Sequence, residues 1–330
     1  MAGTATGTSL PAKPGTEEMS VENIQYVQRK AVDDERWNRV ISLSPYETAY
    51  AHTWYLDACS DEWGALILDD YRVVMPLAYR RKMGISYLYQ PRFCQQLGAY
   101  SEQMVDAPSM KLLVDGMKRS FRMGDYALNE GNHLEDASGV RLSESTNYTL
   151  RLLPGYASVS GGYSTNCRRN LKKAAESGLV FSDHVPVEDL VLLKKEHDHK
   201  VQPESHYGHL IRMFGSLHQQ GHLLACGVMK DGILCAGALL AHGTKRLHYL
   251  LSVSSRAGRE DNAMFLVIDR IIRTHAGNPV CLDFEGSDIP GIARFFSGFG
   301  ALPGTYQRIS LGGRAAGMAQ QIMNRRRHGR

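Results

Sequence analysis

Hydrophobic residues recur along the chain with two different periods. Runs in which apolar residues lie three or four positions apart are typical of helices with one buried face. They predict helices over 33–44, 46–60, 107–123, 160–178, 186–200, 207–221, 259–277 and 289–300. Alternating or continuous apolar runs bounded by polar turns are typical of strands. They predict strands over 21–31, 63–70, 71–82, 85–98, 125–131, 146–153, 179–184, 222–232, 233–245, 246–255, 279–287 and 305–311.

The order of these elements occurs twice. Each half has helices, then three strands joined by short turns, then a helix and a further strand. Such self-similarity indicates a duplicated domain. The fold class is α/β (α+β), with domains expected at 21–153 and 154–312, each a mixed, mostly antiparallel sheet flanked by helices. Residues 1–20, rich in Gly, Thr and Pro, are expected to be disordered, and 313–330 form a basic tail.

Charge and cysteine content narrow the class of protein. A net charge of +4 is modest for 330 residues, and the charges are spread along the chain, so charge alone does not indicate a nucleic-acid partner. The six cysteines are far apart and form no Cys-x-x-Cys pair, which suits reduced thiols in the cytosol. The N-terminus lacks the basic and apolar regions of a signal peptide, and no run approaches the roughly 20 apolar residues of a membrane span. We therefore expect a cytoplasmic protein without a membrane span.

Three short motifs stand out in the second half. They are "STNCRRNLKKAAESGL" at 164–179, "LDFEGS" at 282–287 and "FFSGFGA" at 295–301. With the order of the elements, they resemble the R-R-N-x-x-K-A, D-F-x-G-S and F-K-x-x-F-G elements of the FemABX group of peptidyltransferases, within the GNAT acyltransferase superfamily. The resemblance covers about residues 22–310. It implies two tandem GNAT-like domains in the short form, without the helical arm of some members.

The chain departs from the family pattern in two places. Phe296 stands where the family has the lysine that is thought to assist transfer electrostatically. Acyl-CoA users in the superfamily have a glycine-rich turn after the fourth strand, because glycine lets backbone N–H groups approach the pyrophosphate. Here the turn is "SSRAGREDNA" at 254–263, with no glycine in the usual register. The donor therefore stays open between aminoacyl-tRNA, acyl-CoA and an acyl-carrier-protein thioester.

Two acids lie within the strand predicted over 279–287. Asp283 and Glu285 lie on the same face of that strand, because side chains alternate along a strand. One of them could take a proton from an attacking amine, which must lose its proton before it attacks. The alternative is that they cap the following turn, a role we favour for Asp283.

Basic residues begin the helix that follows residue 164. Cations at a helix start oppose the helix dipole unless an anion such as phosphate offsets them. A solvated helix face is the alternative. The predicted donor-binding or phosphate-binding residues are Arg168, Arg169, Lys172, Lys173, Arg256, Arg259 and Asn262.

Other candidate residues have weaker support. The Tyr249 phenol could donate a proton to the leaving group, or could belong to the core. Cys94 and Cys167 could accept an acyl group, although the direct transfer that the resemblance implies needs no nucleophile. Histidines between 197 and 222 lack the further ligands of a zinc site, so we expect no metal. The cleft between the halves is expected to bind the acceptor through Arg92, Gln95, Gln96, Ser287 and Tyr306.

These residues favour an acyl or aminoacyl transferase that moves an activated acyl group onto an amine. Acyl-CoA or aminoacyl-tRNA would be a co-substrate, with no tightly bound cofactor. The acceptor would be a small molecule or a cell-wall precursor with an amine, and tRNA or an acyl carrier protein would be the macromolecular partner. The alternative is a non-catalytic GNAT-like protein that binds tRNA or an anionic metabolite, whose affinity would fall steeply with salt.

Overall fold

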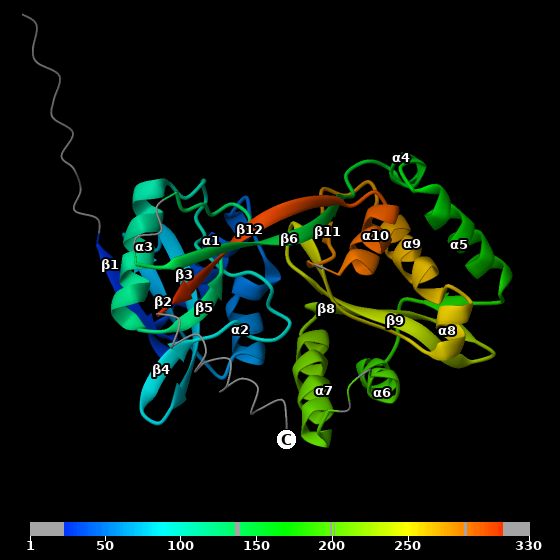
Figure 1. Ribbon diagram of the computed structural model, residues 1–330, viewed down its shortest axis with the longest axis horizontal. Coiled ribbons are helices and arrows are strands. Elements are labelled where there is room, and N and C mark those ends of the chain that lie inside the picture. Colours follow the sequence, from blue (N-terminus) through cyan, green and yellow to red (C-terminus); the bar gives the residue numbers. More distant parts are fainter. Residues whose placement is uncertain (1–22, 136–138, 199, 201, 287–288, 313–330) are drawn as a thin grey trace, which may run out of the picture.

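The strands join into one sheet that runs through the whole molecule (Figure 1). The computed structural model describes residues 23–135, 139–198, 200, 202–286 and 289–312. Across these residues the sheet has 12 strands in the order β1-β2-β3-β4-β5-β12-β6-β11-β10-β9-β8-β7. The α/β fold class and the mostly antiparallel sheet flanked by helices are thus confirmed.

The first half contains an antiparallel meander and three helices. Asp33 caps α1 by accepting hydrogen bonds from the N–H groups of Glu35 and Arg36, and Asp106 caps α3. The elements are β1 (Ile24–Gln28), α1 (Asp34–Leu43), α2 (Thr53–Cys59), β2 (Glu62–Leu68), β3 (Val73–Lys82), β4 (Ile85–Leu88), α3 (Ala107–Ser120) and β5 (Gly124–Ala127), with short 3-10 turns at Arg29–Ala31 and Ala49–Ala51.

The second half repeats this plan with additional helices. β6 (Arg141–Arg151) closes the first half. The elements of the second half are α4 (Tyr156–Gly161), α5 (Thr165–Glu176), β7 (Val180–Ser182), α6 (Val187–His197), α7 (Glu204–Gln219), β8 (Leu223–Lys230), β9 (Ile233–His242), β10 (Arg246–Ser254), α8 (Arg256–Glu260), α9 (Ala263–His275), β11 (Cys281–Asp283), α10 (Pro290–Gly298) and β12 (Leu302–Leu311).

The two halves exchange their last strands. In the first half β4 pairs parallel with β5, and β5 then pairs antiparallel with β12, which comes from the end of the described chain. In the second half β10 pairs parallel with β11, and β11 pairs antiparallel with β6, which is the last strand of the first half. β6 and β12 pair with each other along the middle of the molecule (Figure 1). This exchange joins two six-strand units into one sheet. The boundary at 153–154 therefore marks the point along the chain where the order of the elements begins to repeat. As a boundary between two domains it stays a prediction.

Several elements differ from the sequence predictions. The helix expected over 46–60 is a 3-10 turn at Ala49–Ala51 followed by α2, and the strand expected over 279–287 ends at Asp283, so Glu285 does not share a strand face with it. Two further departures lie after β4 and between α8 and α9. The strand expected over 85–98 ends at Leu88, because Pro91 has no N–H for a ladder and Phe93 adopts a left-handed φ of 57°. The helix expected over 259–277 is interrupted at Asn262, whose φ of 56° is also left-handed, so that α8 ends and α9 begins there. Both departures come from backbone geometry that a hydrophobic pattern does not encode.

The hydrophobic core consists of two clusters that do not correspond to the two halves of the sequence. One cluster includes the first half together with α6, α7 and one face of the second meander, and the Phe93 and Phe214 rings meet within it at 5.1 Å. The other cluster lies under α5, α9 and α10 on the opposite face of the second meander. Since the first cluster spans both halves, the halves are held together by a shared core as well as by the exchanged strands.

Candidate functional site

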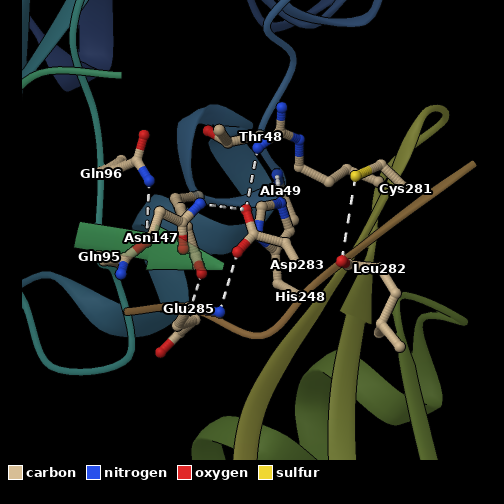
Figure 2. A network of polar contacts seen from close by, with 12 residues as sticks. Thr48, Ala49, Gln95, Gln96, Asn147, His248, Cys281, Leu282, Asp283 and Glu285 are labelled. Carbon is tan, nitrogen blue, oxygen red and sulfur yellow. Dashed lines mark hydrogen bonds and ion pairs between the residues drawn. The ribbon is translucent and has the colours of Figure 1, made fainter. Parts of the chain in front are cut away.

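Asp283 ends β11 in the middle of the sheet and is 1% exposed. Its Oδ2 accepts hydrogen bonds from Arg246 Nη1 at 2.9 Å and from Asn147 Nδ2 at 3.3 Å. Its Oδ1 accepts from the backbone N–H of Glu285 at 2.9 Å, as Figure 2 shows. With both oxygens occupied, Asp283 holds the turn that follows β11, the structural role that we favour for it.

Arg246 joins this acid to the first half. The Nη2 atom of Arg246 forms an ion pair with Glu130, which lies just after β5. The Arg246 side chain is 9% exposed, so the two acids compensate a cation that is almost removed from water. The pair ties the ends of the two parallel strand pairs together.

Glu285 is in a different electrostatic environment. Its φ of 58° lies in the left-handed region, and the hydroxyl of Tyr50 donates a hydrogen bond to its Oε1. No ion pair to Glu285 is found among the described residues. Burial raises the pKa of Glu285 to about 8; the hydrogen bond from Tyr50 offsets part of this rise, and the charge of Asp283 adds to it.

The residue after Glu285 must be glycine. A Cβ at Gly286 would lie 1.9 Å from the carbonyl oxygen of Thr146 and 2.8 Å from Nε2 of Gln95. Because Gly286 has no side chain, β6 and the loop after β4 can both pack closely against the turn. The turn that contains Glu285 therefore packs directly against the first half.

Glu285 opens onto a pocket of about 340 Å³ between the two halves. Gln95 approaches from the loop after β4, and Tyr306 from β12 (Figure 2 shows Gln95 beside the turn). The lining residues are Pro91, Phe93, Cys94, Gln95, Ser145, Thr146, Glu285, Gly286, Tyr306 and Arg308. The pocket is thus built from both halves and from both exchanged strands.

Buried polar contacts fix the first half against β10 beside this pocket. His248 is fully buried, and its Nε2 accepts a hydrogen bond from the N–H of Ala49 at 3.1 Å. Burial and the charge of Arg246 lower the pKa of His248 well below its usual value, so the ring is neutral. Glu47 accepts from the N–H groups of Thr244 and Lys245, at 2.7 Å each. These contacts position Tyr50, which follows Ala49, against Glu285.

The residues predicted for the acceptor cleft are only partly brought together. Gln95 and Tyr306 line the pocket, and buried Gln96 lies behind it, donating to Gln95 Oε1 at 2.8 Å and accepting from the N–H of Glu130. Arg92 instead hydrogen-bonds His206 on α7 and does not line the pocket. Ser287 lies outside the described residues.

The predicted donor residues form a separate surface. Lys173 on α5 donates to the carbonyl of Glu260 at the end of α8, which brings the two basic segments together. The other cations are exposed and have local partners: Arg168 with the Tyr163 carbonyl, Arg169 with Asn166, Lys172 with Glu176, Arg256 with Glu260 and Arg259 with the Ser254 carbonyl. The side chain of Asn262, between α8 and α9, makes no capping hydrogen bond.

Gly258 within this surface has a packing function. A Cβ there would lie 2.3 Å from the carbonyl oxygen of Cys235. The glycine therefore allows α8 to rest on β9, and its position gives no evidence of a phosphate-binding turn.

Aromatic residues fill the space where β10 and β11 diverge. The Phe284 and Phe296 rings stack at 4.6 Å, and Tyr249 meets both edge-on. The Tyr249 hydroxyl donates to Met264 Sδ at 3.0 Å, and burial raises its pKa. Tyr249 thus has the contacts of a core residue, and Phe296, at the family lysine position, belongs to the same cluster.

The cysteines considered as nucleophiles are not activated. Burial raises the pKa of Cys167 to about 12, and burial together with Cys59 raises that of Cys94 well above its usual value. Both are therefore thiols at neutral pH. In the described ranges, no three His, Cys, Asp or Glu residues are grouped as a metal site would require.

Sequence reasoning did not find several residues around Glu285. Tyr50, Asn147, Arg246, His248 and Arg308 lie in ordinary amphipathic or strand-like runs, and no local motif marks them. Their position near the site follows from contacts between distant parts of the chain.

Comparison with solved structures identifies the fold. No protein-family model matches the sequence, and no curated protein matches it significantly. FemX matches with a TM-score of 0.62 and 11% identity over 84% of this chain and 96% of FemX. L-PGS from Bacillus licheniformis matches with a TM-score of 0.55 and 10% identity, covering 89% and 96% of the two chains. A tandem GNAT protein from the clavulanic acid biosynthesis pathway matches with a TM-score of 0.52 and 13% identity, covering 87% and 98%.

The chain therefore has the fold of FemX and of the tandem GNAT protein. In the part of the chain that the structure describes, no helix is long and apolar enough to cross a membrane.

Proposed function

We propose that this protein is an acyl or aminoacyl transferase in which Glu285 accepts the proton of the attacking amine. The observation that carries the proposal is an acid without an ion-pair partner among the described residues, with a pKa of about 8, in a pocket between the halves of a GNAT-type fold. A base is most effective when its pKa lies near the working pH, and an ordinary glutamate is too weak for this task.

The reaction needs no covalent intermediate on the protein. The amine nitrogen bonds to the activated carbonyl carbon, and its proton passes to the Glu285 carboxylate. The tetrahedral intermediate then expels the thiol or hydroxyl leaving group, which takes up a proton as its bond to carbon breaks. The raised pKa values of Cys94 and Cys167 support direct transfer, because a thiol is a poor nucleophile.

The donor is proposed to bind to the second half. The link between α5 and α8 through Lys173 supports a common anion-binding surface that includes Arg169 and Arg256. The name of one structural neighbour mentions AcCoA, which supports an acyl-CoA donor, and the likeness to FemX supports aminoacyl-tRNA. A cytoplasmic location stays a prediction.

The test is a transfer assay with radiolabelled acetyl-CoA and aminoacyl-tRNA as donors and a panel of amines as acceptors. Glu285→Gln should lower kcat/KM by about 100- to 10,000-fold, since the amide cannot accept the proton. Glu144→Gln is the matched control, because Glu144 is exposed on β6 and does not line the pocket. Equal loss in both variants, or full activity in Glu285→Gln, would contradict the proposal.

A non-catalytic binding protein is the second candidate function. Phe296 in place of a cation and the exposed basic residues of α5 favour it. In that case no donor would be consumed. tRNA binding would weaken steeply with salt and would be lost in the double variant Arg168→Ala, Arg169→Ala.

A further inference from the structure

Arg308 is the cation of the Glu285 pocket, and nothing in the sequence motifs marks it. It lies on β12, two residues after Tyr306, so both side chains lie on the same face of the strand. Gln307 between them faces the other way and bonds the backbone N–H and carbonyl of Leu134. The pocket face of β12 therefore presents a phenol and a guanidinium.

Arg308 and Glu285 line the same pocket without forming a pair. Among the described residues, no hydrogen bond or ion pair to the Arg308 guanidinium is found, although the residue is half-buried. An ion pair would place nitrogen and oxygen within 4.0 Å, and the pair Arg308–Glu285 does not meet that distance. The pocket thus has a guanidinium and, apart from it, a carboxyl group that carries the opposite charge once it has lost its proton.

Other half-buried or buried charges near the site are compensated. Arg246 has two acids, and Glu47 has two backbone N–H groups and His52. Partly desolvated charges without partners cost free energy unless a ligand supplies the opposite charge. Among the described residues, Arg308 therefore lacks the partner that these charges have, and Glu285 lacks a cation for its ionised form.

A ligand with an ammonium group and a carboxylate would compensate both residues at once. Its amine would meet Glu285, and its carboxylate would accept two hydrogen bonds from the planar Arg308 guanidinium. Gln95, Ser145 and Thr146 supply further polar groups, and a volume of about 340 Å³ is enough for a small molecule. A simple alkylamine would leave Arg308 without a partner.

We propose that the acceptor is a small amino acid-type molecule, whose carboxylate binds Arg308 while its amine is held at Glu285. The inference rests on the proposed function for the role of the amine. The carboxylate contact at Arg308 is a separate claim that binding alone can test.

Calorimetric titration tests this claim without a donor. The probes are glycine, β-alanine and L-lysine, each compared with the amine that lacks its carboxylate: methylamine, ethylamine and cadaverine. At least one amino acid should bind about tenfold or more tightly than its matched amine. Arg308→Gln should abolish this difference, and Arg308→Lys should restore part of it.

Arg151→Gln is the matched control, because Arg151 is exposed on β6 outside the pocket. It should leave the difference unchanged. The proposal is overturned if no amino acid binds at millimolar concentration. It is also overturned if each matched amine binds as tightly as its amino acid, or if the preference persists in correctly folded Arg308→Gln.

The two proposals fail in different ways. Transfer to alkylamines and amino acids with equal efficiency would contradict the role of Arg308 and leave the transferase intact. Selective binding of amino acids without transfer from any donor would contradict the transferase and leave the carboxylate site intact.

Discussion

The two halves of the molecule carry the same pair of residues at the same place and use it differently. Glu130-Gly131 follows β5, and Glu285-Gly286 follows β11; each is the strand that pairs parallel at the end of its meander. Both glycines are required by close packing, because a Cβ would lie 2.1 Å from the Tyr46 ring at Gly131 and 1.9 Å from the Thr146 carbonyl at Gly286. Both turns are thus closely packed, although Glu285 has a left-handed φ of 58° and Glu130 does not have a positive φ.

The difference between them is electrostatic. Glu130 pairs with Arg246, whereas Glu285 has a hydrogen bond from the neutral Tyr50 hydroxyl and faces a pocket. One turn therefore holds the halves together, and the other has an acid whose pKa is raised to about 8. The comparison indicates that an ion pair distinguishes Glu130 from Glu285, the acid with the raised pKa.

Replacing Arg246 should have the largest effect on stability. Arg246→Met leaves buried Asp283 and half-buried Glu130 without a positive partner, and should lower the free energy of unfolding by about 3–5 kcal/mol at neutral pH. Chemical denaturation measures this loss. Glu130→Gln should cost less, because Arg246 keeps Asp283. A variant Arg246→Met as stable as the wild type would show that the pair does not hold the halves.

The raised pKa of Glu285 should make the stability of the protein depend on pH. The pKa of Glu285 in the folded protein, about 8, lies above its ordinary value of 4.5. Its protonated form therefore stabilises the fold fully below pH 4.5, and this contribution is lost as the pH rises through about 8. Glu285→Gln removes the loss, so its unfolding free energy relative to wild type should rise between these pH values by up to about 5 kcal/mol. A constant difference across this range would contradict the raised pKa.

Tyr50→Phe should have the smallest effect. The Tyr50 hydroxyl lowers the pKa of Glu285 by stabilising the carboxylate. Its removal should therefore move the rise of kcat/KM with pH to more alkaline values, by about one pH unit. Rate profiles of the two proteins measure the shift. Movement to lower pH would mean that Tyr50 does not bond the charged form.

The sequence predicts the framework of this molecule better than its site. The duplicated order of strands and helices, the FemABX-like fold and the place of Asp283 and Glu285 after a central strand all follow from local patterns. Gln95 and Tyr306 are predicted for the cleft and line the pocket.

The remaining site residues depend on contacts that no local pattern encodes. Tyr50 and Glu285 are 235 positions apart. Arg308 reaches the pocket because β12 crosses to the first half and pairs with β5, whereas the order of the elements suggests that each half keeps its own strands. The electrostatic difference between Glu130 and Glu285 arises from the same long-range packing.

The most direct test of the account is a pH titration of the protonated carboxyl band by difference infrared spectroscopy. Wild-type protein should show a band that disappears with a midpoint near pH 8. The same band should be missing from Glu285→Gln and unchanged in the surface control Glu144→Gln. If all carboxyl bands of the wild type disappear at the pH of ordinary acids, with no difference from Glu285→Gln at neutral pH, Glu285 is an ordinary carboxylate and the central claim is contradicted.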